Sequence, residues 1–278
     1  MASKIIFVAK DNRKADVAIT DDIACQISDV SLSTDERVVI VQSPQPVAQV
    51  QKSLPDDRRE MDVFVIDTAA PPPRVLLADM DSTIIESETL DDLAAHFGIA
   101  GEIAAITERA MRGDLDFDAA LTERVAMLEG LPESAITELL PRLEISHGAA
   151  ELLAACKAKE MTCVLISGGF THVTGYVADK LGFDAHHGNE FVITKQKLTG
   201  EVKQPIQDKN AKLKMLNTLV SDLDITPAEV MAVGDGANDI PMLQAAGYGV
   251  AYHAKPKVIE ATDLHIVHTD LSALIYLL

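Results

Sequence analysis

The sequence predicts an α/β protein with a Rossmann-like core, in which helices cover a parallel sheet. Short apolar runs alternate with helical patterns through the second half of the chain, the rhythm typical of βαβ units. A block of helical periodicity without a convincing strand interrupts this rhythm between Ser87 and Glu144. Three consecutive prolines precede the first core strand. We therefore expect a small N-terminal α/β domain, a core and a helical cap inserted into the core.

Residues 1–70 are expected to form the small domain. Three apolar runs predict its strands in a β-α-β-α-β order, at Lys4–Ala9, Arg37–Gln42 and Val63–Asp67. The prolines Pro71 to Pro73 then fix the backbone and remove its donors, so they predict a stiff linker and a domain boundary.

The catalytic core is predicted to comprise residues 74–86 and 146–278, and the cap residues 87–145. Residues Phe191–Thr194, flanked by Gly-containing turns, predict a hairpin or flap within the core range. The core strands are expected at Val75–Ala78, Thr162–Ile166, Val230–Val233 and Tyr248–Ala251, with helices beginning at Thr171 and Ala237. The cap helices are expected at Glu88–Phe97, Ala100–Met111, Asp116–Glu129 and Pro132–Leu139.

Charge and composition restrict the class of partner. The net charge of −19, with 4% aromatic residues and no Trp, disfavours binding to nucleic acid, because a phosphate backbone requires a basic surface. No apolar stretch approaches membrane-spanning length, and the first residues lack the pattern of a signal peptide. Three cysteines without a C-x-x-C pair favour a reducing compartment. We expect a soluble cytoplasmic protein that acts on a small molecule.

Polar residues follow three of the predicted core strands, where ligands bind in open α/β sheets. Asp79 and Asp81 follow the first strand, and two carboxylates at this spacing can supply a nucleophile and a proton donor. Alone, the pair could equally cap a turn. The turn of Ser167 and Gly168 offers N–H groups and a hydroxyl to an anion, although it could be only a tight turn.

The third strand end carries an oxygen-rich cluster suited to a hard cation such as Mg²⁺: Asp235, Asn238 and Asp239. The order of these residues excludes an EF-hand loop, and helix N-capping is the alternative. Lys209 stands at the expected start of a helix, where the dipole disfavours a cation. Either a solvent-exposed lysine or a lysine held by a nearby anion fits that position.

Together these residues resemble the four motifs of the haloacid dehalogenase superfamily: Asp79-Met80-Asp81-Ser82-Thr83, Ser167, Lys209 and Gly234-Asp235-Gly236-Ala237-Asn238-Asp239. The resemblance implies that Asp79 is the nucleophile and that Asp81 is the general acid and base. It also implies a phosphate site formed by Ser167, Gly168, Lys209 and Asn238. Mg²⁺ would then be held by Asp79, the Asp81 backbone carbonyl and Asp235, with Asp239 in support.

The predicted cap contains residues that suggest a substrate. Arg124 falls within an apolar stripe of the third cap helix, and Glu88 lies in the first turn of the first. Each has a structural alternative, a solvated arginine or a dipole-stabilised acid. Phosphoserine, however, presents an ammonium and a carboxylate that this pair matches. Here the sequence is similar to phosphoserine phosphatases, in which Phe117 would help to close the cap and hydrolysis completes serine biosynthesis.

Several alternatives stay open at the level of sequence. A phosphotransferase from phosphoserine to homoserine, or a phosphatase of another small metabolite, would show the same motifs. An amino-acid-sensing protein on a retired phosphatase fold is the alternative outside enzymes. Related proteins often carry ACT-type domains, yet residues 1–70 show three clear strands instead of four, so we expect at most a degenerate ACT-like domain with a regulatory or interaction role. A homodimer, the stereochemistry of the substrate and the resting position of the cap are not determined.

Overall fold

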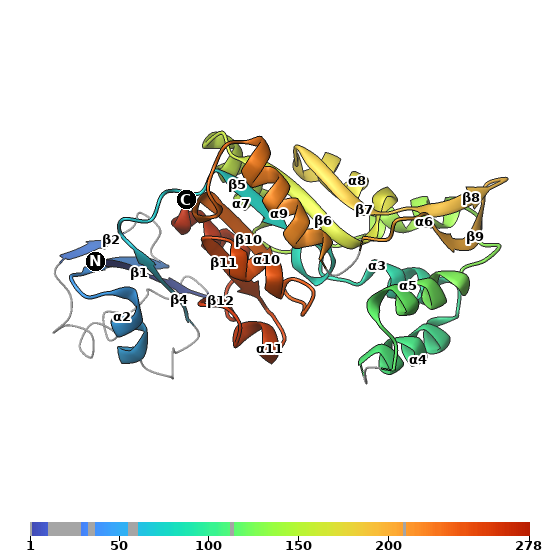
Figure 1. Cartoon of the computed structure of the whole chain (residues 1–278), viewed down its shortest axis with the longest axis horizontal. Helices are drawn as coiled ribbons and strands as arrows, with labels where there is room; N and C mark the ends of the chain where they lie inside the picture. Colours follow the sequence, from blue (N-terminus) through green and yellow to red (C-terminus); the bar gives the residue numbers. More distant parts are fainter. Residues whose placement is uncertain (1, 11–28, 33–36, 55–60, 112–113, 208–209) are drawn as a thin grey trace.

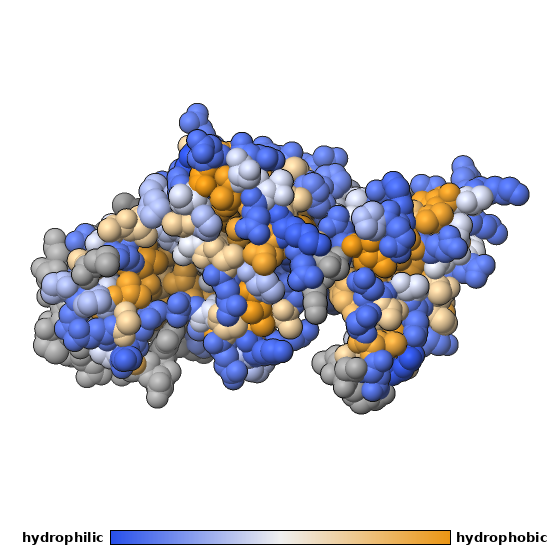
Figure 2. Space-filling model, viewed as in Figure 1, coloured by the Kyte–Doolittle hydropathy of each residue, from blue (hydrophilic) through white to orange (hydrophobic). Residues whose placement is uncertain are grey.

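The computed structural model describes residues 2–10, 29–32, 37–54, 61–111, 114–207 and 210–278. Along its long axis lie an N-terminal sheet, a central core and a lobe that contains α4 and α5 (Figure 1). In the space-filling view the outline is notched between the core and that lobe (Figure 2). Within the described residues, no helix has the length and apolar character needed to cross a membrane.

The core is built on a parallel sheet whose strands are ordered β12-β11-β10-β5-β6-β7. All four predicted core strands are confirmed. Two edge strands were missed, because one is only three residues long and the other contains two histidines and a glycine. The strands are β5 (Val75–Ala78), β6 (Thr162–Phe170), β7 (Ala185–Asn189), β10 (Val230–Gly234), β11 (Tyr248–Tyr252) and β12 (Leu264–Ile266).

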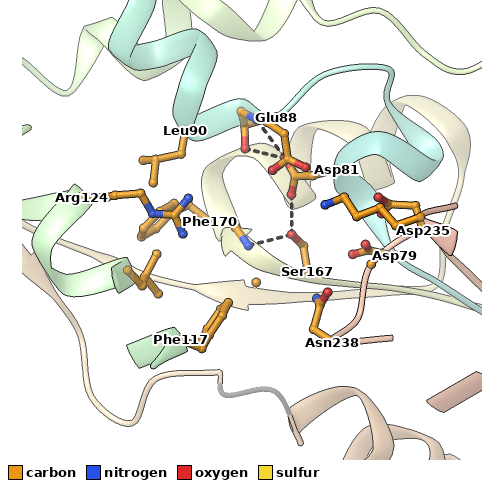
Figure 3. A pocket seen from close by; sticks show the side chains of 16 residues that line it. Asp79, Asp81, Glu88, Leu90, Phe117, Arg124, Ser167, Phe170, Asp235 and Asn238 are labelled. Atoms are coloured by element: carbon orange, nitrogen blue, oxygen red, sulfur yellow. Dashed lines mark hydrogen bonds between the residues drawn. The ribbon is translucent and has the colours of Figure 1, made fainter. Parts of the chain in front are cut away.

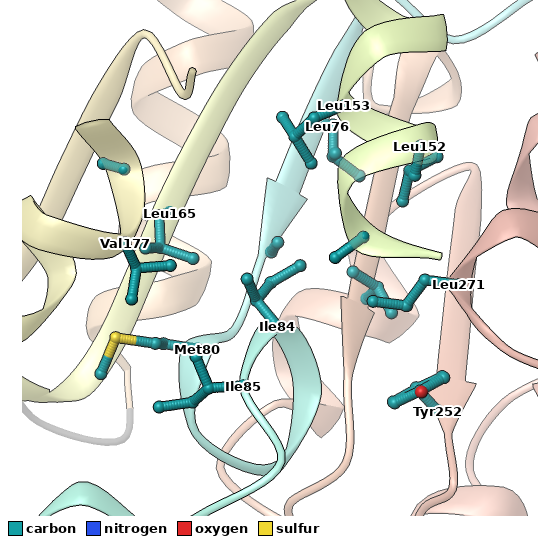
Figure 4. Close-up of a cluster of buried hydrophobic side chains, with 14 of the residues drawn as sticks. Leu76, Met80, Ile84, Ile85, Leu152, Leu153, Leu165, Val177, Tyr252 and Leu271 are labelled. Carbon is teal, nitrogen blue, oxygen red and sulfur yellow. The ribbon is translucent and has the colours of Figure 1, made fainter. Parts of the chain in front are cut away.

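The central strand β5 is buried on both faces, as a parallel strand between two helical layers requires. Val75 and Leu77 belong to one apolar cluster, while Leu76 and Ala78 belong to the other, following the two-residue period of a strand. Figure 4 shows Leu76 beside Leu152 and Leu153 of α7. The covering segments are α7 (Ala149–Ala158), α8 (Thr171–Leu181), α9 (Ala211–Asp222), η4 (Pro227–Glu229), α10 (Ile240–Ala245), α11 (Pro256–Ile259) and η5 (Leu271–Leu277).

The predicted insertion is helical, as expected. It contains α3 (Thr89–His96), α4 (Ala100–Met111), α5 (Phe117–Ala126), α6 (Ser134–Leu139) and η3 (Leu140–Arg142). The predicted hairpin is also present, as β8 (Phe191–Thr194) and β9 (Lys197–Val202). It contacts the core, where the Phe191 ring stacks on Phe170 of β6 with ring centroids 3.5 Å apart. Backbone hydrogen bonds between Leu198 and residues 130 and 131 also attach it to the insertion.

The N-terminal unit is an antiparallel sheet in the order β2-β3-β1-β4. The expected β-α-β-α-β arrangement with three strands was wrong, since Asp29–Leu32 forms a fourth strand. That strand was missed because it alternates two apolar residues with two polar ones and has no continuous apolar run. The N-terminal sheet therefore has the same number of strands as the ACT pattern. The elements are β1 (Ser3–Ala9), β2 (Asp29–Leu32), β3 (Val38–Ser43), α2 (Val47–Ser53) and β4 (Met61–Asp67).

This N-terminal sheet is packed directly against the core. On one face, Ile5 and Phe7 form a cluster with Val50 of α2. On the other, Ile6 and Phe64 belong to the same apolar cluster as the core. Pro71 to Pro73 separate the N-terminal sheet from the core in sequence. The apolar side chains of the two units nevertheless pack into one shared interior.

A single buried carboxylate reinforces this packing. Asp62 of β4 is 2% exposed and accepts hydrogen bonds from three successive backbone N–H groups of the segment after β12. The donors are Val267 (2.8 Å), His268 (3.2 Å) and Thr269 (2.8 Å), and the Thr269 hydroxyl also donates, at 2.5 Å. Removing the carboxylate would leave buried donors without an acceptor, which costs more than a typical hydrogen bond contributes.

We predict that Asp62→Asn lowers the free energy of unfolding by about 3 kcal/mol, because the new amide presents donors to backbone N–H groups. Chemical denaturation measures this change. The matched control is Asp67→Asn in the same strand, where the carboxylate accepts one exposed bond from Ala69. It should cost less than about 1 kcal/mol. Equal effects of the two substitutions would show that Asp62 does not anchor the sheet.

Candidate active site

The predicted site residues of the core meet at the carboxyl-terminal edge of the parallel sheet. Asp79 directly follows β5, Ser167 lies near the end of β6, and Asp235 follows β10. Because β5 pairs with both β6 and β10, these strand ends are neighbours. The chain turns sharply after Asp79, and Ser82 has a left-handed backbone with φ of 54°. Asp81 lies within this turn, directly before Ser82.

Asp79 is 5% exposed and contacts a buried lysine, Lys212. The Lys212 Nζ lies 2.6 Å from Asp79 Oδ1 and 2.5 Å from Asp239 Oδ1. Burial and the neighbouring Asp239 raise the pKa of Asp79 well above its ordinary value, and Lys212 opposes this shift. The two carboxylates raise the pKa of Lys212 despite its burial. Lys212 therefore stays charged and holds the Asp79 carboxylate in place.

Lys212 was missed in the sequence, where Lys209 was predicted to bind phosphate. Lys209 lies outside the described residues. Lys212 stands in the first turn of α9 and is buried together with Leu216, one turn further along. A lysine aligned with the apolar face of a helix is the same anomaly that identified Arg124, so the sequence did contain a signal.

Asp81 is oriented by hydrogen bonds at both of its oxygens. Its Oδ1 accepts from the backbone N–H of Thr89 at 3.0 Å and from the Thr89 hydroxyl at 2.7 Å. Its Oδ2 accepts from the Ser167 hydroxyl at 2.7 Å, and the Ser167 Oγ in turn accepts from the Gly169 N–H at 2.7 Å. Figure 3 shows Asp81 between Glu88 and Ser167. Thr89 was not identified from the sequence.

The irregular end of β6, residues 167–169, has the geometry of an anion cradle. A Cβ at Gly169 would lie 3.0 Å from both Asp81 Oδ2 and Ser167 Oγ, so a side chain there would crowd the site. The carbonyl of Gly168 accepts a 2.8 Å hydrogen bond from Asn189, a buried residue at the end of β7. Asn189 also accepts from the Gln207 N–H at 2.7 Å. Asn189, likewise missed in the sequence, therefore links this cradle to the segment that precedes Lys212.

The acidic residues of the site form a cluster suited to a hard cation. Carboxylate oxygens of Asp79, Asp235 and Asp239 lie within 4.8 Å of one another. Burial and repulsion from Asp239 raise the pKa of Asp235, which indicates an excess of negative charge. Both oxygens of Asp239 already have partners, because Oδ1 accepts from Lys212 and Oδ2 accepts from the Gly236 N–H at 2.9 Å. Asp239 therefore supports the cluster, while Asp235 is more open.

The predicted cap residues line the same cavity, whose volume is about 240 Å³. Glu88, Phe117 and Arg124 face Asp79 and Asp81 across it, beside Ser167, Gly168, Asp235 and Asn238. The Phe117 ring packs against Gly168 of β6. A Cβ added to this glycine would lie 3.0 Å from the Phe117 Cζ. Figure 3 shows the Arg124 guanidinium directed into the cavity. The structure thus brings all described predicted site residues to one cavity or its immediate wall.

Glu88 and Arg124 have unusual electrostatic environments. Glu88 accepts a 3.0 Å hydrogen bond from the Ser82 hydroxyl. Although Glu88 remains accessible through the opening, the cavity walls displace water and, with Asp81 nearby, raise its pKa to about 7. Burial lowers the pKa of Arg124. Its Nε donates only a 3.4 Å bond to the Ala120 carbonyl. These two groups can bind charges of opposite sign on one ligand.

Comparison with known proteins gives an independent result. The family model described as haloacid dehalogenase-like hydrolase matches residues 76–244. A phosphoserine phosphatase from Albidiferax ferrireducens is 44% identical over 225 residues, which cover 77% of this chain and 95% of that protein.

Two solved structures extend the comparison. A HAD-family hydrolase from Salmonella enterica serovar Typhi superposes with a TM-score of 0.90 at 29% identity, covering 99% of this chain and 98% of that one. A phosphoserine phosphatase solved as an analogue of its phospho-aspartyl intermediate gives a TM-score of 0.69 at 33% identity. It covers 74% of this chain and 99% of its own.

We predict that Lys212→Met lowers the free energy of unfolding by about 3 kcal/mol in buffer containing a chelator, because two buried carboxylates lose their counter-charge. Chemical denaturation is the measurement. Lys214→Met, two residues along α9 and exposed, is the control and should change stability by less than about 0.5 kcal/mol. An unaltered stability of the Lys212 variant would mean that the buried contact does not hold these segments together.

Proposed function

Because the chain belongs to the haloacid dehalogenase-like hydrolases, we propose that it hydrolyses O-phosphoserine to serine and phosphate through a phospho-aspartyl intermediate on Asp79. One observation carries the proposal. A single cavity joins the Asp79 and Asp81 pair to Glu88 and Arg124, so groups for both ends of phosphoserine face the same space. The names of the relatives agree with this assignment.

Recognition of the amino-acid end follows from charge. The ammonium of phosphoserine is suited to the carboxylate of Glu88, which lines the cavity. The carboxylate is suited to Arg124, which offers a planar fork of N–H donors. Leu90 and Leu121 line the cavity beside these groups and limit the space available to larger substrates. We propose that Phe117 closes the cavity over the phosphate end.

The first chemical step transfers the phosphoryl group to the enzyme. An Asp79 oxygen attacks phosphorus as the bond from phosphorus to the serine oxygen breaks, and Asp81 donates its proton to that oxygen. We propose that Ser167, Gly168 and Asn238, which line the cavity, hold the phosphoryl oxygens. Lys212 keeps Asp79 aligned throughout.

The second step returns Asp79 to its initial state. Asp81, now ionised, accepts a proton from water as the water oxygen attacks phosphorus. The bond between phosphorus and Asp79 breaks, and inorganic phosphate leaves. One carboxylate thus serves as acid in the first step and as base in the second.

A divalent cation fits the acidic cluster, and we propose Mg²⁺. Its holders would be Asp79, Asp235 and the backbone carbonyl of Asp81, with Asp239 in support, an all-oxygen set of the kind that Mg²⁺ requires. Bound there, Mg²⁺ would neutralise phosphoryl charge during transfer. Lys209, the phosphate ligand implied by sequence, is replaced in this proposal by Lys212.

We also propose that the protein works in the cytoplasm, in the last step of serine biosynthesis. The described cysteines Cys156 and Cys163 are free thiols, in keeping with a reducing compartment. For residues 1–70 we propose an ACT-like regulatory role. The order β2-β3-β1-β4 and the helix α2 on one face support a ligand-sensing or assembly unit of that kind.

The direct test is phosphate release from phosphoserine with Mg²⁺, before and after Asp79→Asn. We expect turnover that is abolished by a chelator and restored by Mg²⁺, and a loss of at least about 1,000-fold in the variant, which lacks the nucleophile. Asp263→Asn, at an exposed position, is the control. Retained turnover in the Asp79 variant would refute the mechanism, and predominant transfer to added homoserine would identify a phosphotransferase instead.

Arg124→Met tests substrate recognition while retaining an unbranched apolar stem. We expect kcat/KM for phosphoserine to fall about 10- to 100-fold, the loss of a charge-assisted pair, with little change for glycerol 2-phosphate. Arg109→Met is the matched control, because Arg109 pairs with Glu123 on the cap surface at 2.6 Å. A parallel loss on both substrates would show that Arg124 does not read the amino-acid end.

A further inference from the structure

Thr89 joins the cap to the general acid and base. It is the first residue of the cap helix α3 and is 5% exposed. Both of its donors, the backbone N–H and the hydroxyl, are directed at the same oxygen, Asp81 Oδ1. Glu88, at the N-cap position of α3, makes no capping bond with its own side chain. The Asp81 side chain therefore serves as the N-cap acceptor of α3, although Asp81 lies in the active-site turn and not next to that helix in sequence.

The two oxygens of Asp81 are not equivalent as a result. A carboxylate oxygen has two lone pairs, and both acceptor positions of Oδ1 are occupied by Thr89. Oδ2 accepts one bond, from the Ser167 hydroxyl. It also lies against Gly169, where the missing side chain leaves space, since an added Cβ would approach Oδ2 to 3.0 Å. A proton carried by Asp81 therefore has room on Oδ2 and none on Oδ1.

We infer that Thr89 is a positioning residue that makes Oδ2 the oxygen through which Asp81 transfers its proton, and that docking of the cap orients the acid. This inference rests on the proposed phospho-aspartyl mechanism. In the first step the proton leaves Oδ2 for the departing alcohol oxygen as the phosphorus–oxygen bond breaks and the Asp79–phosphorus bond forms. In the second, Oδ2 takes a proton from the attacking water as the Asp79–phosphorus bond breaks.

Leaving-group dependence separates this role from a merely structural one. An alkoxide must be protonated as it leaves, whereas p-nitrophenolate leaves readily without a proton. The parameter kcat/KM covers the steps up to release of the alcohol, so it reports the acid and not the later base. A substitution that only loosens the cap would slow both kinds of ester, and one that misplaces the acid slows alkyl esters selectively.

The experiment compares Thr89→Val and Thr89→Ser with the unmodified chain on glycerol 2-phosphate, phosphoserine and p-nitrophenyl phosphate. For Thr89→Val we expect kcat/KM to fall about 10- to 100-fold on the two alkyl esters, as for loss of one hydrogen bond to a charged group, and less than about threefold on the aryl ester. Thr89→Ser retains the hydroxyl and should stay within about threefold of the unmodified chain on all three.

Thr122→Val is the matched control, because its hydroxyl donates to the Asp118 carbonyl on an exposed face of the cap helix α5. It should leave all three substrates unchanged. The inference would be overturned if Thr89→Val lost equal activity on alkyl and aryl esters, or if Thr89→Ser lost as much activity as Thr89→Val. Glycerol 2-phosphate lacks the amino-acid end, so the comparison still applies if phosphoserine proves not to be the substrate.

Discussion

The buried contact of Lys212 with Asp79 and Asp239 is the interaction on which the catalytic end of the core depends. It joins three segments that are distant in sequence: the end of β5, the first turn of α9 and the start of α10. Three charges are removed from water there, a cost that only close pairing offsets. The loop after β10 folds tightly around the same contact, because a Cβ on Gly234 would lie 2.5 Å from Asp239 Cγ. The position of Asp79 and the shape of the acidic loop thus have one cause.

The cap is attached to this rigid end by a paired connection. Ile85 and Ile145 form an antiparallel bridge where the chain leaves and re-enters the core, with flanking backbone bonds such as Ser146 N–H to the Ile84 carbonyl at 3.0 Å. Beyond this pair, the cap contacts the site at Thr89 and at Phe117. The cap therefore brings Glu88, Arg124 and the hydrogen bonds to Asp81 to the core together, and the position of all of them depends on how the cap docks.

Most of the core could be predicted from the sequence, because its strands are continuous apolar runs and its chemistry follows the strand ends. Val75–Ala78 has the same bounds in sequence and structure. The features that were missed depend on tertiary partners. β2 has too few apolar residues to stand out, and the hairpin joins the cap through backbone pairing with residues 130–133. Lys212 was passed over because a lysine is usually exposed, whereas here two carboxylates make its burial favourable.

The charge of the site explains how an acidic protein can accept an anionic ester. Five carboxylates, Asp79, Asp81, Glu88, Asp235 and Asp239, meet three cations, Lys212, Arg124 and Lys255. The acids therefore exceed the cations by about two charges before any ligand enters. Lys212 is already paired with Asp79 and Asp239. Burial is the largest cause of the raised pKa values of Asp79, Glu88 and Asp235, and repulsion from neighbouring carboxylates adds to it. One divalent cation cancels the excess of negative charge, and the ammonium of an amino-acid substrate offsets Glu88 in addition. A phosphate ester without an ammonium group would leave the Glu88 carboxylate without a cation beside it, so the acids that favour a bound cation also favour a zwitterionic substrate.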